Sequence, residues 1–342
     1  MTEIRVGVIG AGKHGREHAR VYASMPGVRL AAVVDLDERR ATKTAAEFGA
    51  VACSDFRNIP DVQAVSIAVP TIGHYPLTRH FLERGVAVLL EKPMTSTLEE
   101  AEQLAAVAGE RRMLLQIGHV ERFNPAVSAI ESLVDAPRYI ETRRVSPFSF
   151  RSTDIGVVLD LMVHDLDLVL HFSRSSVSRV EAVGVALLTS SEDMANARIN
   201  FENGCVANLT VSRVARKKVR EFRIFQRDRY ITVDLAGGHA SCISRNPGAL
   251  PSGGNIAEPP AHVDPHEYFM RQFVSVEDIP MVSVEPLAAE IRSFVDCLRT
   301  GAPPVVGPEE GVAVMRVATH ICRSIRASCE ERGLSRLAGA PV

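Results

Sequence analysis

The sequence has no uncharged apolar run that approaches the roughly 20 residues needed to span a bilayer. Its net charge of −2 over 342 residues gives no electrostatic reason to expect binding to nucleic acid or to an anionic membrane. The six cysteines are scattered without a Cys-x-x-Cys pair, which favours neither a zinc site nor a disulfide framework. A strand pattern begins within four residues of the N-terminus and leaves no room for a signal peptide, so we expect a cytoplasmic protein.

Alternating strand and helix patterns fill the first 120 residues. A chain of this length with 46% hydrophobic residues can form two domains with sizeable cores. The first five predicted strands are apolar throughout, as strands covered on both faces should be. They lie at 4–9, 30–34, 64–69, 86–90 and 113–117. This pattern predicts an α/β domain over residues 1–122, built on a doubly wound parallel sheet.

Shorter strands separated by turns follow Phe123. They are predicted at 137–145, 178–188, 195–201, 205–212, 219–226 and 229–235, with helices near 124–134 and 155–172. The spacing predicts an α+β domain over residues 123–342 with an open, mostly antiparallel sheet. Residues 236–265, rich in Gly and Pro, are predicted to form a long connection that serves as a lid or an oligomer arm or has no fixed order. The last helices, near 286–298 and 309–328, are free to pack back on the first domain.

The most informative motif is Gly10-x-Gly12-x-x-Gly15, at the end of the first predicted strand. Gly10 permits a tight turn, Gly12 lets the backbone approach a pyrophosphate, and Gly15 lets the next helix pack on the strand. The N–H groups at the start of that helix point at the phosphates. Asp35, at the end of the next strand, can accept from a ribose 2′-hydroxyl and repel a 2′-phosphate. We therefore predict a Rossmann fold that binds NAD rather than NADP.

A lysine follows the fourth predicted strand, in Glu91-Lys92-Pro93. Ligands of open α/β sheets bind beyond the carboxyl ends of the strands, so Lys92 is placed where a substrate would meet the cofactor. Its ammonium can donate to a substrate oxygen as an alcohol becomes a ketone. A solvated loop lysine beside a turn proline fits the local pattern equally well.

A second polar pair, Asp160 and His164, interrupts an apolar segment. The four-residue spacing puts both side chains on one face of a helix. A neighbouring carboxylate orients a histidine and raises its basicity, which suits a base that acts near neutral pH. A hydrogen-bonded core pair is the alternative. No matched second cluster of ligands appears elsewhere, so we expect no metal.

Three other polar segments carry weaker signals. Residues 70–74 suit either a contact with the nicotinamide half of the cofactor or a plain helix cap. Residues 118–125 lie at the predicted domain junction, where ligand pockets are common, although a solvated linker would look similar. The third signal is a group of arginines, Arg143, Arg144 and Arg151. They either pair with a diphosphate or lie on a face of the sheet without a ligand.

Taken together, these motifs resemble one family. The glycine motif with Asp35, the runs AVPTIGH at 68–74 and EKPMTSTLEEA at 91–101, and the GxxxDxxxH pattern at 156–164 match its order and spacing. It is the glucose-fructose oxidoreductase, inositol dehydrogenase and MocA family, and the similarity extends over nearly the whole chain. The resemblance implies an N-terminal Rossmann domain, a second domain often used for oligomer contacts, and hydride transfer between a sugar or cyclitol carbinol and a nicotinamide.

Carried over position by position, the resemblance implies catalytic roles for Lys92, Asp160 and His164. The cofactor-binding positions that it implies are Gly10, Gly12, Lys13, His14, Gly15, Asp35, Arg40, Thr71, His74, Glu91 and Lys92. No catalytic position is lost, which argues against a non-catalytic NAD-binding sensor.

Longer runs, GHVERFNPA at 118–126 and the stretch 146–170, resemble a subgroup, the UDP-N-acetylglucosamine 3-dehydrogenases. That likeness implies NAD-dependent oxidation of the sugar C3 hydroxyl, which feeds amination on the route to amide-linked lipid A. The candidates for contact with this UDP-sugar are His119, Arg122, Asn124, Arg151 and His164.

The expected mechanism places the hydroxyl between Lys92 and His164. His164, oriented by Asp160, takes the proton while Lys92 stabilises the oxygen, or the two exchange roles. Alternatives are a UDP-N-acetylglucosaminuronate or inositol-type dehydrogenase. We expect a homodimer or homotetramer formed through the C-terminal sheet.

Overall fold

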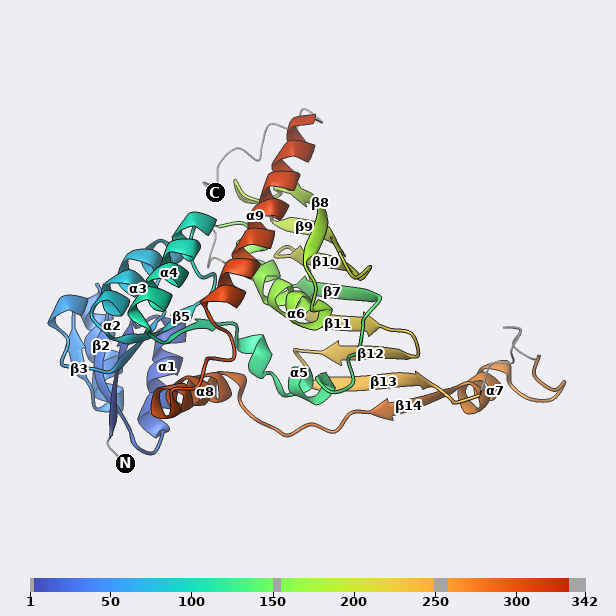
Figure 1. The fold of residues 1–342 in the computed structure, drawn as a ribbon, viewed down its shortest axis with the longest axis horizontal. Helices are drawn as coiled ribbons and strands as arrows, with labels where there is room; N and C mark the ends of the chain where they lie inside the picture. Colours follow the sequence, from blue (N-terminus) through green and yellow to red (C-terminus); the bar gives the residue numbers. More distant parts are fainter. Residues whose placement is uncertain (1–2, 150–154, 249–257, 332–342) are drawn as a thin grey trace.

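The computed structural model describes residues 3–149, 155–248 and 258–331 of the chain. Two sheets dominate the molecule, and Figure 1 shows them side by side with helices between them. The first sheet belongs to the N-terminal part of the chain and the second to the C-terminal part. The buried apolar side chains of the described residues form three clusters, two at the first sheet and one at the second.

The first sheet has the strand order β3-β2-β1-β4-β5-β6, and its strand pairs are parallel. Its strands are β1 (Ile4–Ile9), β2 (Val28–Val34), β3 (Val51–Cys53), β4 (Ala64–Ile67), β5 (Ala87–Glu91) and β6 (Leu115–Gly118). This order is that of the doubly wound Rossmann fold, as predicted. The strand β3 was not predicted, because it has three residues and two of them are exposed.

Helices cover both faces of the first sheet: α1 (Lys13–Ser24), α2 (Glu38–Phe48), α3 (His74–Glu83) and α4 (Leu98–Arg111). Thr97 caps α4, since its side chain accepts from the backbone N–H of Glu100 while the Glu100 carboxylate accepts from that of Thr97. The side chain of Asp37 caps α2 in a similar way. These caps fix where each helix begins and therefore where the preceding loop ends.

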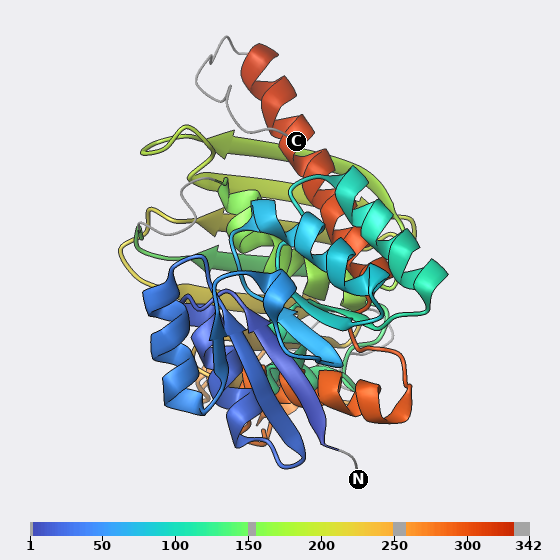
Figure 2. The same ribbon diagram turned by 90° about the vertical axis from the view of Figure 1, so that its left-hand side faces the viewer.

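The second sheet has the order β14-β13-β12-β11-β7-β10-β9-β8. Its strands are β7 (Tyr139–Val145), β8 (Val177–Val185), β9 (Met194–Phe201), β10 (Val206–Ser212), β11 (Val219–Phe225), β12 (Arg229–Asp234), β13 (His239–Arg245) and β14 (Val274–Asp278). Only the pair β7–β10 is parallel among its described strands, so the predicted mostly antiparallel sheet is confirmed. Helices α5 (Pro125–Ile130) and α6 (Val163–Ser173) lie on the face turned toward the first domain (Figures 1 and 2).

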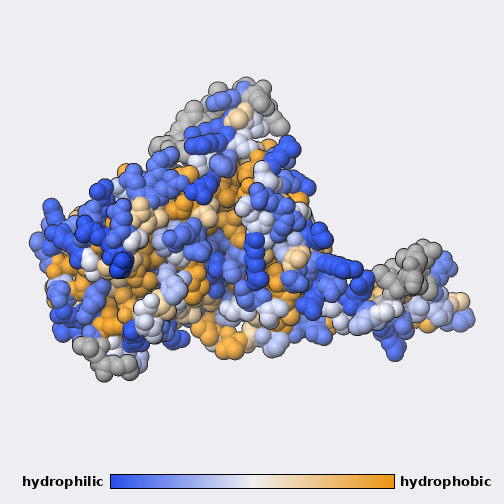
Figure 3. All heavy atoms as spheres, viewed as in Figure 1, coloured by the Kyte–Doolittle hydropathy of each residue, from blue (hydrophilic) through white to orange (hydrophobic). Residues whose placement is uncertain are grey.

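The predicted connection at 236–265 was partly wrong, because β13 lies within it and pairs with β12. Its sequence, His-Ala-Ser-Cys-Ile-Ser-Arg, is mostly polar, so the sheet rather than strand propensity specifies this strand. The helix α7 (Pro265–Gln272) and β14 then form an arm that projects from the second sheet (Figure 1). The arm's surface is mostly hydrophilic in Figure 3.

Two long helices close the described chain, α8 (Pro286–Thr300) and α9 (Pro308–Glu331). α8 packs against α1, while α9 packs against α4 of the first domain and against α6 and β8 of the second. Figure 2 shows α9 running past both domains. A Cβ at Gly311 would lie 2.7 Å from Met94 Sδ, so this glycine lets α9 approach the first domain closely. None of the helices in the described ranges combines the length and apolar character needed to cross a bilayer.

Candidate active site

The glycine turn after β1 has the close contacts that require glycine. Gly10 has φ +98°, and a Cβ there would lie 2.4 Å from the Ala68 carbonyl oxygen. A Cβ at Gly15 would lie 1.7 Å from the Gly10 carbonyl oxygen, so α1 approaches the turn more closely than any side chain would allow. A Cβ at Gly12 would meet nothing within 4 Å, which leaves open space beside the backbone for a ligand.

The start of α1 suits an anion. Gly12 is its N-cap residue and supplies no side-chain hydrogen bond, so the N–H groups of the first turn are not capped by it. Lys13 and His14 follow at exposed positions of that turn. The helix therefore has the N–H donors and the positive dipole end that bind a phosphate.

Asp35 lies beside this turn at the end of β2. Its Oδ2 accepts from the Ala11 N–H at 2.8 Å, and its Oδ1 accepts from the Asp37 N–H at 2.9 Å and from Arg40 Nη2 at 2.9 Å. Burial raises the pKa of Asp35, but the bonds from Arg40 and the backbone more than compensate, so its pKa is lowered. Asp35 is thus an ionised carboxylate that braces the glycine turn.

His74, at the start of α3, links two loops of the first domain. It is buried, and its Nδ1 lies 2.8 Å from the Pro93 carbonyl oxygen while Nε2 lies 3.0 Å from that of Val69. His74 thus ties the loop after β4 to the loop after β5, and its contact with the cofactor stays a prediction. Thr71 begins the short 3-10 helix Thr71–Gly73 and is half-buried there.

Glu91 ends β5 and starts a buried polar chain. Its Oε1 lies 2.9 Å from His18 Nε2, His18 Nδ1 lies 3.1 Å from Ser66 Oγ, and Ser66 Oγ lies 2.8 Å from the Tyr22 hydroxyl. Burial raises the pKa of Glu91, but the bond and charge of His18 outweigh it and lower the pKa to about 2. The backbone before Lys92 is therefore held by an ionised, hydrogen-bonded carboxylate.

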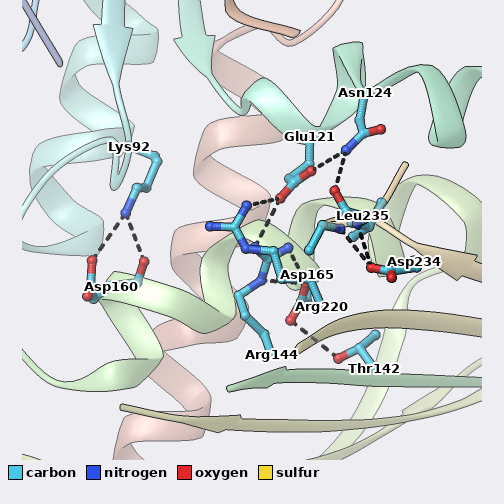
Figure 4. Close-up of polar contacts among 12 residues, drawn as sticks. Lys92, Glu121, Asn124, Thr142, Arg144, Asp160, Asp165, Arg220, Asp234 and Leu235 are labelled. Atoms are coloured by element: carbon cyan, nitrogen blue, oxygen red, sulfur yellow. Dashed lines mark hydrogen bonds and ion pairs between the residues drawn. The ribbon is translucent and has the colours of Figure 1, made fainter. Parts of the chain in front are cut away.

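Lys92 crosses from the first domain to the second (Figure 4). Its Nζ donates to the Asp160 backbone oxygen at 2.8 Å and lies 3.3 Å from Asp160 Oδ1. Both side chains are about four-fifths buried, with exposed fractions of 17% and 21%. Lys92 is thus held at the domain junction. The alternative interpretation of the sequence, a solvated loop lysine, does not fit this burial.

The predicted pairing of Asp160 with His164 is not found. No hydrogen bond joins these two side chains in the described part of the chain, and Asp160 is directed at Lys92 instead. Asp160 lies in the π-helical turn Val158–Met162, which precedes α6, and His164 lies in the first turn of α6. Asp160 therefore positions the lysine and not the histidine.

His164 lies at the start of α6, in surroundings rich in positive charge. Burial lowers the pKa of its imidazole well below the usual range, and the charges of Lys92, Arg144, His119 and Arg220 lower it further. Its Nδ1 is buried without a hydrogen-bond partner. His164 is consequently neutral at physiological pH. The positive charge of Lys92, which lies across the domain junction, helps to destabilise the protonated imidazole.

A buried ionic network below the site was not predicted from the sequence (Figure 4). Arg144 on β7 donates to Asp165 Oδ1 at 2.8 Å and to Glu121 Oε1 at 3.0 Å. Arg220 on β11 reaches the same Glu121 oxygen at 3.4 Å. These four residues come from four separate segments, so local sequence patterns gave no signal beyond the polar character of each segment.

Several predicted substrate residues have structural partners. Asn124 is buried and donates to Glu121 Oε2 at 3.0 Å and to the Leu235 carbonyl oxygen at 3.2 Å, so it joins the network. Arg122 lies 3.2 Å from Asp167, with both side chains largely buried. The buried His119 keeps its Nδ1 without a partner. These contacts do not support direct substrate binding by Arg122 and Asn124.

Arg151 lies outside the described residues. Within the described ranges, no group of three or more His, Cys, Asp or Glu side chains is arranged to hold a metal ion. The carboxylates nearest His164, Asp165 and Asp167, are instead paired with Arg144 and Arg122.

A Rossmann dinucleotide site that meets a lysine and a histidine at a domain junction defines a two-domain, nicotinamide-dependent oxidoreductase. Comparison with known proteins supports this class of protein. The model of an oxidoreductase family with an NAD-binding Rossmann fold matches residues 4–119, and that of the GFO/IDH/MocA C-terminal domain matches residues 127–231. The chain belongs to the GFO/IDH/MocA family, as its motifs predicted, and its cofactor is NAD.

Individual relatives support this membership. UDP-N-acetylglucosamine 3-dehydrogenase from Acidithiobacillus ferrooxidans is 36% identical over 332 residues, which cover 96% of this chain and 99% of the relative. A solved structure of that enzyme matches with a TM-score of 0.85 over 96% of this chain and 99% of the other. GenD2 from gentamicin A biosynthesis, solved in complex with NAD, matches with a TM-score of 0.77 at 23% identity over 96% and 95% of the two chains, which shows the shared fold.

Proposed function

We propose that this protein oxidises the C3 hydroxyl of UDP-N-acetylglucosamine to the 3-keto sugar with NAD. The observation that carries the chemistry is the junction at which Lys92, from the end of β5, binds Asp160 next to His164. The choice of substrate is supported by the relative of that activity, which is 36% identical over nearly the whole of both chains. The ketone formed is the group that a PLP-dependent aminotransferase would aminate on the route to amide-linked lipid A.

The residues around the glycine turn fit NAD. The open space at Gly12 and the start of α1 suit a pyrophosphate, and the ionised Asp35 suits a ribose diol. The negative charge of Asp35 opposes a 2′-phosphate, and this supports a preference for NAD over NADP. When bound, NAD accepts the hydride from the carbinol carbon.

Two side chains act on the substrate oxygen in this proposal. Lys92, held by Asp160, donates a hydrogen bond to the hydroxyl oxygen and stabilises the negative charge that develops on it. His164 is neutral and therefore able to accept the hydroxyl proton. The cations around His164 destabilise its protonated form, which favours onward release of that proton.

Turnover with a panel of substrates tests the proposal. The purified protein is mixed with NAD and UDP-N-acetylglucosamine, and reduced nicotinamide is followed by its absorbance. A PLP-dependent aminotransferase is added to consume the ketone, since oxidation of such a carbinol is expected to be uphill. We expect a UDP-linked 3-amino sugar by mass spectrometry. Faster reduction of NAD with UDP-N-acetylglucosaminuronate or inositol, and no amino sugar, would contradict the proposal.

A further inference from the structure

Two arginines stand directly opposite one another on neighbouring strands of the second sheet. In the antiparallel register of β7 and β11, Arg144 pairs with Arg220. Like charges in this position destabilise a sheet unless anions compensate them. Both residues lie on the face of the sheet that is turned toward the first domain, since they alternate with the outward-facing Arg143 and Glu221.

The two arginines differ in how many carboxylate contacts each of them makes. Arg144 is fully engaged by Asp165 and Glu121 and is buried, with a side-chain exposure of 3%. Arg220 has one long contact, 3.4 Å to the Glu121 oxygen that Arg144 already binds, and its side chain is 36% exposed. The guanidinium of Arg220 is therefore incompletely neutralised and partly exposed.

A third cation joins them. Lys218 is exposed at the start of β11, and no carboxylate pairs with it among the described residues. The charge of Arg220 lowers the pKa of Lys218, together with burial and the charges of Arg144 and Lys13. Lys218 directly precedes β11 and lies two residues before Arg220 in the chain. Lys218 and Arg220 thus place two positive charges close together at the start of this strand.

We propose that Lys218 and Arg220 form a binding site for the diphosphate of a bound ligand. A diphosphate has the charge that this cluster lacks, and the guanidinium fork of Arg220 matches phosphate oxygens. If the proposed function is right, the UDP-sugar is one source of this group, and the dinucleotide is the other. Neither residue belongs to the positions predicted from the sequence, because the cluster depends on the pairing of β7 with β11.

Binding measurements with UDP and with ADP-ribose test this site without turnover. Isothermal titration calorimetry is carried out on the intact protein and on the variants Arg220→Gln and Lys218→Met. We expect about tenfold weaker binding of one of the two probes for each charge removed. Loss of UDP affinity alone assigns the site to the nucleotide sugar, and loss of ADP-ribose affinity alone assigns it to the dinucleotide.

The controls remove one charge elsewhere. Arg223→Gln changes the same strand on its outward side, where Arg223 pairs with Glu141, and Lys217→Met changes the neighbouring residue. Thermal unfolding verifies that each variant is folded. Unchanged affinity for both probes in folded Arg220→Gln and Lys218→Met would overturn the inference. A wild type that binds UDP but does not oxidise UDP-N-acetylglucosamine would refute the proposed function alone.

Discussion

At the scale of single residues, the two proposed reacting groups are held by different means. Lys92 is anchored by two oxygens of Asp160, whereas His164 has an unpartnered Nδ1 in a buried, cationic environment. Removing either group should leave the glycine turn and Asp35 unaltered, because neither of those makes a hydrogen bond to Lys92 or His164 among the described contacts.

We therefore expect Lys92→Ala and His164→Ala each to lower kcat by about 100-fold to 10,000-fold. The affinity for NAD, measured by fluorescence titration, should stay close to that of the wild type. Asp160→Asn retains the backbone oxygen that holds Lys92 and should have a smaller effect than either alanine variant. Full turnover in Lys92→Ala or His164→Ala would exclude the catalytic assignment.

His119 should make the protein less stable at acid pH, because it binds a proton more readily in the unfolded chain than in the folded one. Burial, with the charges of Arg122 and Lys92, lowers the pKa of His119 to about 3, whereas an unfolded chain has a histidine pKa near 6.5. Between these values the unfolded state binds the extra proton, so the free energy of unfolding falls as the pH drops below 6.5. The loss is about 1.4 kcal/mol per pH unit, or about 2 kcal/mol between pH 7 and pH 5.

Urea unfolding of the wild type and of His119→Gln at both pH values measures this contribution. The difference between the two proteins cancels opposing groups such as Asp167, whose pKa is raised by burial to about 7 and which therefore contributes stability that is lost as the pH rises. Parallel pH dependences in the two proteins would show that His119 titrates normally in the folded state.

At the scale of elements, two glycines of the turn between β1 and α1 have different roles, Gly12 in binding and Gly15 in packing. A Cβ at Gly12 meets nothing within 4 Å, while a Cβ at Gly15 would lie 1.7 Å from a backbone oxygen. Gly12→Ala should therefore weaken NAD binding by calorimetry with little change in melting temperature. Gly15→Ala should lower the melting temperature itself. Equal effects of the two variants on melting temperature would contradict this separation.

The strands and helices with strong local patterns were predicted well. The five apolar strands predicted for the first sheet were found, at β1, β2, β4, β5 and β6. The polar strand β13 was missed, and the helix predicted over 124–134 is shortened to Pro125–Ile130. The strand β13 depends on its pairing with β12 and β14 rather than on local periodicity.

At the scale of the whole molecule, the outer face of the second sheet is left without a helix layer (Figures 1 and 2). It carries exposed apolar side chains, among them Val183, Val185 and Phe225. We expect this face to join copies of the chain into a homodimer or homotetramer, which light scattering after size-exclusion chromatography measures. Val185→Glu should shift the mass toward the monomer, and the exposed Val305→Glu, in the loop between α8 and α9, is the matched control. A monomeric wild type would contradict this expectation.

The sequence by itself determined the dinucleotide turn, the parallel sheet and the family, because these depend on residues close together in the chain and on backbone conformations that only glycine allows. The tertiary structure alone decided that Asp160 binds Lys92, since a π-helical turn and a separate domain meet there. It also decided that Arg220 stands opposite Arg144. Contacts of this kind depend on strand register and domain packing, and no local spacing of residues encodes them.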